Sequence, residues 1–216
     1  MLMTPIAIIH SLFKEKFSIP RQPGLVSFES KIELLTPYNR PESLVGLENF
    51  SHVWIFFQFH ANKNITSENL SLSVRPPRLG GNKKLGVFAT RSPFRPNSIG
   101  LSLVKLERIE GTSLIVSGGD FLDQTPVIDI KPYLKEIESI PEATSGWTVG
   151  IENKKLPVHF RCECQENLKQ EITQVLSLDP RPRFHEDGHK QYGSRLGEFD
   201  IHWIVEDNVV YVLEII

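Results

Sequence analysis

Cysteine and long apolar runs are scarce in this chain of 216 residues. Its two cysteines, Cys162 and Cys164, are separated by one residue, which is too close for an ordinary structural disulfide within a regular strand. No stretch approaches the roughly 20 apolar residues that a bilayer span needs, and the N-terminal apolar run of about five residues is too short for a signal peptide. We therefore expect a cytoplasmic protein with free thiols and no membrane contact.

An excess of charge of either sign is also absent. The formal net charge is −2 and charged residues make up 23% of the chain, which excludes both a wholly basic nucleic-acid coat and an acidic disordered chain. The length and a hydrophobic share of 40% suffice for one domain of ordinary size and a small second one. A core of that size needs neither disulfides nor a metal to be stable.

Several motifs of well-known chemistry are missing. The sequence has no Walker loop, no G-x-G-x-x-G after an expected strand and no G-x-S-x-G elbow, so nothing supports ATP hydrolysis, dinucleotide chemistry or serine hydrolysis. The two cysteines lack a second Cys/His pair at zinc spacing. His185 and His189 are four residues apart, but Gly188 and the flanking prolines disfavour a helix that would bring them together. We predict no metal site.

Short runs rich in Val, Ile and Phe, bounded by turn residues, are typical of strands. Such runs occupy residues 6–9, 53–59, 85–90, 99–106, 113–116 and 127–130. Because most of them have no helical period between them, they indicate an antiparallel barrel or a sandwich rather than a doubly wound sheet. We expect a mainly β fold with an antiparallel barrel over residues 1–140.

A small, acidic segment at residues 136–146, broken by a proline, is the expected linker. We predict that a small α+β domain follows over residues 147–216. Apolar residues at helical spacing between Leu168 and Leu176 indicate one amphipathic helix. Alternation of apolar and polar residues over 199–205 indicates the first strand of a hairpin.

The stretch Val74–Gly100 is unusual because it holds six Lys and Arg residues and not one Asp or Glu. Its prolines restrain the loops that present the arginines, arginine forks suit phosphate oxygens, and Phe94 offers a stacking surface for a base. The candidate contacts with RNA or another polyanion include Arg75, Arg78 and Arg95. The alternative is a solvated basic face whose prolines merely shape turns.

The stretch Asp120–Tyr133 is the second candidate region. Its residues 123–126 are expected to form a tight turn that aims main-chain polar groups at one point, as recognition of a small ligand requires. Asp129 follows on an alternating strand and is expected to point inward, where a carboxylate needs a partner such as Arg91 or Arg95. A structural ion pair at the barrel rim is the alternative.

Long segments that run in order through most of the chain carry a resemblance. They are residues 13–25 (FKEKFSIPRQPGL), 50–60 (FSHVWIFFQFH), 74–81 (VRPPRLGG), 86–102 (GVFATRSPFRPNSIGLS), 120–133 (DFLDQTPVIDIKPY), 179–182 (DPRP) and 192–193 (YG). Together they resemble the TsaA-like family. The resemblance implies a β-barrel methyltransferase, usually a homodimer, that binds S-adenosylmethionine (SAM) outside any Rossmann fold. The implied reaction methylates N6 of threonylcarbamoyladenosine at tRNA position 37, beside the anticodon.

The same resemblance transfers the family's SAM contacts residue by residue. They fall on Pro23, Gly24, Leu25, His60, Ala61, Arg91, Leu101, Gln124, Thr125, Pro126 and Val127. Arg91 suits the carboxylate of SAM. Ala61 and Gln124 depart from the family pattern, which has a polar residue and a glycine at these places. A main-chain contact tolerates Ala61, whereas Gln124 disfavours the left-handed backbone region that glycine enters freely.

The implied acceptor nitrogen belongs to a urea-like group, so we expect a base or a polarising group to take or weaken its proton. His60 and Asp129 are the catalytic candidates, and the sequence does not choose between them. Two rival interpretations stay open. One is a SAM-dependent barrel enzyme with a different acceptor, and the other is a non-catalytic RNA-binding module.

Contacts with the tRNA anticodon loop are expected in two places. Arg95 and Asn97 of the basic stretch would position the phosphate and the base, and Arg181 and Arg183 of the second unit would add contacts. On this interpretation the second unit serves tRNA binding, and removing everything after residue 146 leaves SAM binding largely intact.

Overall fold

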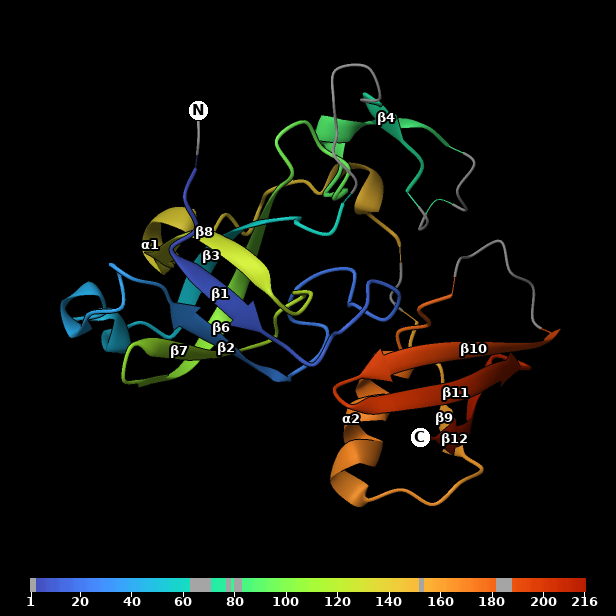
Figure 1. Cartoon of the computed structure of the whole chain (residues 1–216). Helices are drawn as coiled ribbons and strands as arrows, with labels where there is room; N and C mark the ends of the chain where they lie inside the picture. Colours follow the sequence, from blue (N-terminus) through green and yellow to red (C-terminus); the bar gives the residue numbers. More distant parts are fainter. Residues whose placement is uncertain (1–2, 63–70, 77–78, 80–82, 152–153, 182–187) are drawn as a thin grey trace.

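A closed six-stranded barrel forms the first part of the computed structural model, which describes residues 3–62, 71–76, 79, 83–151, 154–181 and 188–216 (Figure 1). Its strands are β1 (Ala7–His10), β2 (Glu29–Leu34), β3 (His52–Gln58), β6 (Ile99–Glu110), β7 (Ser113–Ser117) and β8 (Thr125–Pro132). They pair in the order β1-β2-β7-β6-β3-β8, and β8 pairs back with β1. Every pair is antiparallel, which confirms the expected barrel.

The barrel closes around side chains that alternate along its strands. In β3, Val53, Ile55 and Phe57 are at most 4% exposed, whereas Trp54 and Phe56 are half-buried on the outer face. All six strands contribute to this core, and full burial of one such apolar side chain contributes roughly 1.5–3 kcal/mol. The outer face of β3 is therefore less covered than a run of five apolar residues suggests.

Two elements of the first part differ from the sequence pattern. The pattern does not predict β2, whose sequence ESKIEL holds only two large apolar residues, although these face the core. The strand expected at residues 85–90 is wrong for most of its length. Only β5 (Leu85–Gly86) forms, paired with β4 (Ser73–Val74), and a 3-10 helix (Val87–Ala89) follows that leaves Phe88 77% exposed.

A four-stranded sheet covered by one helix forms the second part. The sheet order is β10-β11-β12-β9, with β9 (Val158–Phe160) parallel to β12 and the other pairs antiparallel. The remaining elements are α2 (Glu166–Leu176), β10 (Gly188–Leu196), β11 (Phe199–Glu206) and β12 (Val209–Ile215). Trp203 of β11 and Ile172 of α2 are both fully buried in one hydrophobic cluster, so the predicted helix and hairpin are confirmed.

Short helices occupy the connections. They are the 3-10 helices Pro41–Ser43, Leu47–Asn49 and Gly146–Thr148 and the single-turn α1 (Lys135–Glu138). Residues 134–146, between the two parts, are all exposed. No helix in the described ranges has the length and apolar character needed to span a membrane.

The chain between β1 and β2 packs with the second part. Phe13, Val26 and Phe28 are at most 8% exposed and belong to the same cluster as Trp203, with the ring centroids of Phe13 and Phe28 5.9 Å apart. The division of the chain into residues 1–140 and 147–216 stays a prediction. Residues 13–28 contribute side chains to the core that the second part builds.

The same segment covers one edge of the second sheet. The amide of Gly197 donates to the carbonyl of Leu12 at 2.7 Å, and Phe13 forms an isolated bridge with Leu196. The amide of Arg195 donates to a carboxylate oxygen of Glu15 at 3.0 Å. Residues 12–15 therefore satisfy the free backbone groups at this end of β10.

Replacement of Phe13 tests how strongly the segment holds the second core. We expect Phe13→Ala to lower the free energy of unfolding by about 3–5 kcal/mol, because it leaves a cavity among buried side chains. Phe199→Ala is the matched control, since Phe199 is 42% exposed and its loss should cost about 0.5 kcal/mol or less. Urea unfolding measures both, and equal losses would contradict the packing described.

Candidate functional site

Three loops beside the barrel are joined by side-chain hydrogen bonds. Asn62, in the loop after β3, donates from Nδ2 to the carbonyl of Pro93 at 2.9 Å. Arg91, in the same loop as Pro93, donates from Nη1 to Oε1 of Gln22 at 2.9 Å. The loops over residues 20–25, 60–62 and 90–95 therefore meet, although they are far apart in the sequence.

The turn before β8 joins the same group of loops. The hydroxyl of Thr125 donates to the carbonyl of Leu122 at 2.7 Å and lies 3.4 Å from Nδ1 of His60. The ammonium of Lys16 donates to the carbonyl of Ala61 at 2.5 Å. The structure thus brings together all four segments that carry predicted SAM residues.

A cavity of about 510 Å³ lies on the outer face of the barrel beside the loops over residues 20–25 and 90–95, and neither His60, Ala61 nor residues 124–127 line it. Pro23, Gly24 and Arg91 line it, together with Trp54 of β3 and Leu103 of β6. Gly24 has a φ of +79°, and nothing lies within 4 Å of the position that a Cβ would take. Small-molecule sites have volumes of about 300–1,000 Å³. The lining also holds Lys105, and apolar side chains beside cations fit the apolar and carboxylate parts of SAM.

The other predicted SAM residues differ in exposure. Leu101 is 44% exposed on the outer face of β6, and Leu25 and Pro126 are half-buried. Val127 is fully buried, and its carbonyl accepts the amide of Ile6 at 2.8 Å. Val127 therefore belongs to the barrel wall, with its side chain in the core.

Gln124 takes the left-handed conformation that the family pattern assigns to glycine. Its φ is +63°, its amide donates to the carbonyl of Ile9 at 2.8 Å, and its Nε2 lies 3.2 Å from Nδ1 of His10. A residue with a Cβ pays about 1–2 kcal/mol for this backbone region. The turn keeps its shape despite the side chain.

His60 meets the electrostatic requirement for a general base. Burial lowers the pKa of its imidazole, the ammonium of Lys16 lowers it further, and the Gln58 carbonyl and the Asp123 carboxylate oppose the change. A lowered pKa leaves the ring neutral at neutral pH, so it has a nitrogen able to accept a proton.

Asp129 does not point inward, and this expectation is corrected. A bulge between Phe56 and Phe57 in the pairing of β3 with β8 leaves Ile128 unpaired, so Ile130 packs against the barrel core and the Asp129 side chain is 48% exposed. Its charged partner is Lys131, at 3.1 Å, rather than Arg91 or Arg95. The alternation that predicts an inward carboxylate breaks at the bulge.

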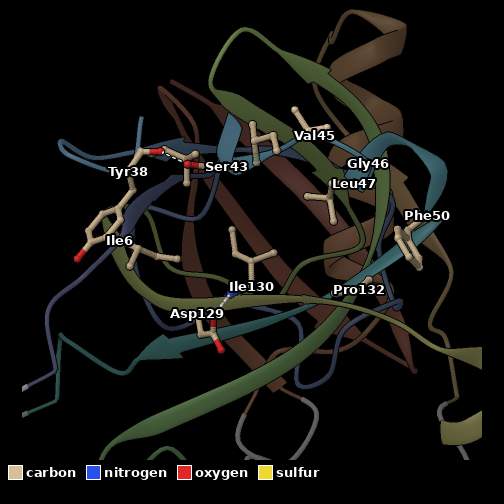
Figure 2. Close-up of a pocket in the computed structure, with 12 residues that line it drawn as sticks. Ile6, Tyr38, Ser43, Val45, Gly46, Leu47, Phe50, Asp129, Ile130 and Pro132 are labelled. Carbon is tan, nitrogen blue, oxygen red and sulfur yellow. Dashed lines mark hydrogen bonds between the residues drawn. The ribbon is translucent and has the colours of Figure 1, made fainter. Parts of the chain in front are cut away.

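Asp129 also lies in a different place from His60. It lines a second cavity of about 490 Å³ with Ile6, Tyr38 and Leu47 (Figure 2). Thr125, the neighbour of His60, is four residues back along β8, which is about 13 Å at the usual rise of about 3.3 Å per residue. The two catalytic candidates therefore do not share one site.

Asp120 is a buried carboxylate that the sequence analysis missed. It accepts a hydrogen bond from the hydroxyl of Ser102 on β6. Burial raises the pKa of Asp120, and the Ser102 hydrogen bond and the nearby Arg91 guanidinium oppose the change. The sequence offered one signal for Asp120: it is an acidic residue just before the 123–126 turn and is followed by two apolar residues, Phe121 and Leu122.

The RNA candidates of the basic stretch are placed differently. Arg75 and Asn97 are exposed. Arg95 is half-buried, and its Nη1 donates to the carbonyls of Thr90 and Ser92 at 2.9 and 3.4 Å, so it shapes its own loop. Arg78 lies outside the described residues.

The structure describes only one of the two RNA candidates of the second part, Arg181. Arg181 is 7% exposed, and its guanidinium binds the Asp179 carboxylate through Nε–Oδ1 and Nη2–Oδ2 distances of 2.7 and 3.0 Å. A buried and doubly bonded side chain does not lie on a surface that meets RNA. Arg183 lies outside the described residues.

The fold and the site define a class of protein before any comparison. It is a two-part barrel protein with a cavity between loops and the outer face of the barrel, not at the strand ends of a parallel sheet.

Comparisons with known proteins agree with this class and narrow it. The family model described as the tRNA-methyltransferase O N-terminal domain matches residues 8–139, and the TrmO C-terminal domain model matches residues 153–216. The chain belongs to the tRNA-methyltransferase O family.

Relatives and solved structures cover nearly the whole chain. A tRNA (adenine(37)-N6)-methyltransferase of Escherichia coli K12 is 42% identical over 94% of this chain and 92% of its own. A putative S-adenosylmethionine-dependent methyltransferase of Pseudomonas aeruginosa is 42% identical over 93% of this chain and 91% of its own. The crystal structure of TrmO from Pseudomonas aeruginosa superposes with a TM-score of 0.80 at 35% identity, covering 100% of this chain and 98% of that one.

Replacement of Asp120 gives a pH-dependent prediction. The pKa of Asp120 is raised in the folded protein. The folded protein therefore loses stability as the pH rises above the pKa of about 3.9 that an Asp has in the unfolded chain. We expect Asp120→Asn to raise Tm at about pH 7 and the gain to shrink toward about pH 4. Thermal unfolding across this range measures it, with Asp200→Asn as an exposed control. A gain independent of pH would contradict the argument.

Proposed function

We propose that this protein is a SAM-dependent methyltransferase that modifies N6 of the adenosine at tRNA position 37. The observation that carries the proposal is the identity of 42% to the Escherichia coli tRNA (adenine(37)-N6)-methyltransferase over almost the full length of both chains. The loop cluster around the cavity of about 510 Å³ supports it, because its lining fits SAM. SAM, when bound, supplies an electrophilic methyl group.

We propose further that the acceptor is threonylcarbamoyladenosine and that the anticodon loop is the part of tRNA that binds. The support is the resemblance of the segments around Arg91 and Asp120 to one family throughout their length. Exposed Arg75 and Asn97 lie in the same basic stretch as Arg91 and are available to phosphates. Since the substrate is tRNA, we assign the protein to the cytoplasm.

Each site residue has one role in the proposal. Arg91 binds a carboxylate through its guanidinium, and the loop at Pro23 and Gly24 holds the cofactor against the outer face of β3 and β6. His60 accepts, on an imidazole nitrogen, the proton that the acceptor nitrogen loses. Asp129 lies about 13 Å from Thr125 along β8, so we remove it from the reaction.

We propose that two copies of the chain associate. Phe88, Phe94 and Leu101 are large apolar side chains that are 77%, 57% and 44% exposed. They come from the 3-10 helix after β5, the loop over residues 90–95 and the outer face of β6. Exposed apolar side chains gathered in one region are typical of an interaction surface.

Methyl-labelled SAM tests enzyme, cofactor and acceptor together. The protein is incubated with two tRNAs that differ only in the threonylcarbamoyl group at position 37, and the products are digested to nucleosides. We expect label only in the hypermodified adenosine. Label in neither tRNA, with SAM binding measured separately, points to another acceptor, and no SAM binding leaves an RNA-binding module.

Replacement of His60 tests the base. We expect His60→Ala to lower kcat by about 10²-fold or more and Asp129→Ala, the matched control, to leave kcat close to the wild-type value. Because the pKa of His60 is lowered from 6.5, the wild-type rate should begin to decrease toward acid only at a pH lower than about 6.5. If His60→Ala keeps near-normal methylation, positioning alone accounts for the rate.

A further inference from the structure

The loop that carries Pro23 and Gly24 is held by the second part of the chain. Just before it, Arg21 donates from Nη2 to the carbonyls of Asp179 and Arg181 at 3.3 and 3.2 Å. Both acceptors belong to the turn that follows α2. The position of the N-terminal end of the loop therefore depends on the shape of that turn.

The other end of the loop is held from α2. Gln174 accepts through Oε1 the amide and the hydroxyl of Ser27, at 2.8 and 3.0 Å. Ser27 lines the same cavity as Gly24, and its neighbours Val26 and Phe28 are buried in the second core. The wall of the cavity over residues 23–27 is thus attached at both ends to residues after 147.

The turn itself is kept in a strained shape by one ion pair. Asp179 has a φ of +49°, in the left-handed region that residues with a Cβ disfavour. The guanidinium of Arg181 binds both carboxylate oxygens of Asp179, and its side chain is 7% exposed. A planar fork that meets a carboxylate with two bonds fixes direction as well as distance, so it aims the two carbonyls at Arg21.

The line of contacts ends at the cavity. Gln22, next to Arg21, accepts the Nη1 hydrogen of Arg91 at 2.9 Å, and Arg91 lines the cavity. A series of contacts therefore runs from Arg181 to Asp179, to Arg21 and Gln22, and on to Arg91.

We propose that Arg181, through Asp179 and Arg21, is a positioning residue for the cofactor loop, so that the second part of the chain sets the affinity for SAM. The inference rests on the proposed function. It replaces the expectation that Arg181 contacts tRNA and that SAM binding is independent of the residues after 146. An Arg181 that contacted RNA would have to give up its two bonds to the Asp179 carboxylate.

Two variants test the inference in the full-length protein. Arg181→Lys keeps the positive charge but loses the planar guanidinium fork. Arg21→Gln removes the donor that contacts the turn from the loop. Arg21 is half-buried and its replacement leaves the core untouched, so we do not expect this variant to misfold. Arg161→Gln is the matched control. Arg161 lies after β9, is 47% exposed and pairs with Glu206.

Binding of SAM and of tRNA is measured separately, by calorimetry and by filter binding. We expect both test variants to weaken SAM binding about tenfold, to raise the KM for SAM, and to leave tRNA affinity and kcat at saturating SAM close to wild type. Without SAM, amide hydrogens of residues 21–27 should exchange faster in both variants. Arg161→Gln should change none of these values.

The opposite pattern overturns the inference. If Arg181→Lys weakens tRNA binding and leaves SAM affinity unchanged, Arg181 serves RNA. If Arg21→Gln binds SAM as the wild type does, the loop does not need the turn. Failure of the proposed function looks different, because the wild-type protein itself would then fail to bind SAM.

Discussion

The rest of the structure depends on one constraint. Residues 13–28 lie between two barrel strands in the sequence, but they contribute to the core of the second part. Phe13 and Phe28 enter the cluster around Trp203, and the chain between them has to leave that core and return to it. The projecting part is the loop at Pro23 and Gly24, which closes one side of the cavity. The cavity is therefore a result of how two cores share one segment.

Much of the fold follows from alternation in the sequence, and the exceptions have physical reasons. Patterns with three or more large apolar residues, as in β3 and β11, predict strands because burial alone drives them. β2 and β10 are polar, and the hydrogen bonds of neighbouring strands hold them in place, which no local pattern records. Val87 and Phe88 favour a strand locally, but the pairing of β5 with β4 continues only as far as the Val87 amide, which donates to the carbonyl of Leu72 at 3.0 Å, and the 3-10 helix begins there.

The sequence predicts which segments form the candidate site but not how their side chains are arranged. The family resemblance predicts Gly24, His60 and Arg91 as SAM contacts, and the structure joins the three loops that carry them through hydrogen bonds of neighbouring residues. The direction of Asp129 depends on a bulge, and the burial of Arg181 depends on packing between distant residues. Both are tertiary properties that one sequence does not contain. Asp120 was missed because the desolvation of a carboxylate is visible only once its neighbours are placed.

The cover that residues 12–15 give to β10 bears on how the second part behaves when produced alone. An uncovered strand edge offers free N–H and C=O groups that pair with any other exposed edge. Here the amides of Arg195 and Gly197 are satisfied by Glu15 and Leu12, from the other end of the chain. A fragment that starts after residue 146 lacks this cover, and its natural failure is edge-to-edge aggregation, even where each of its strands forms correctly.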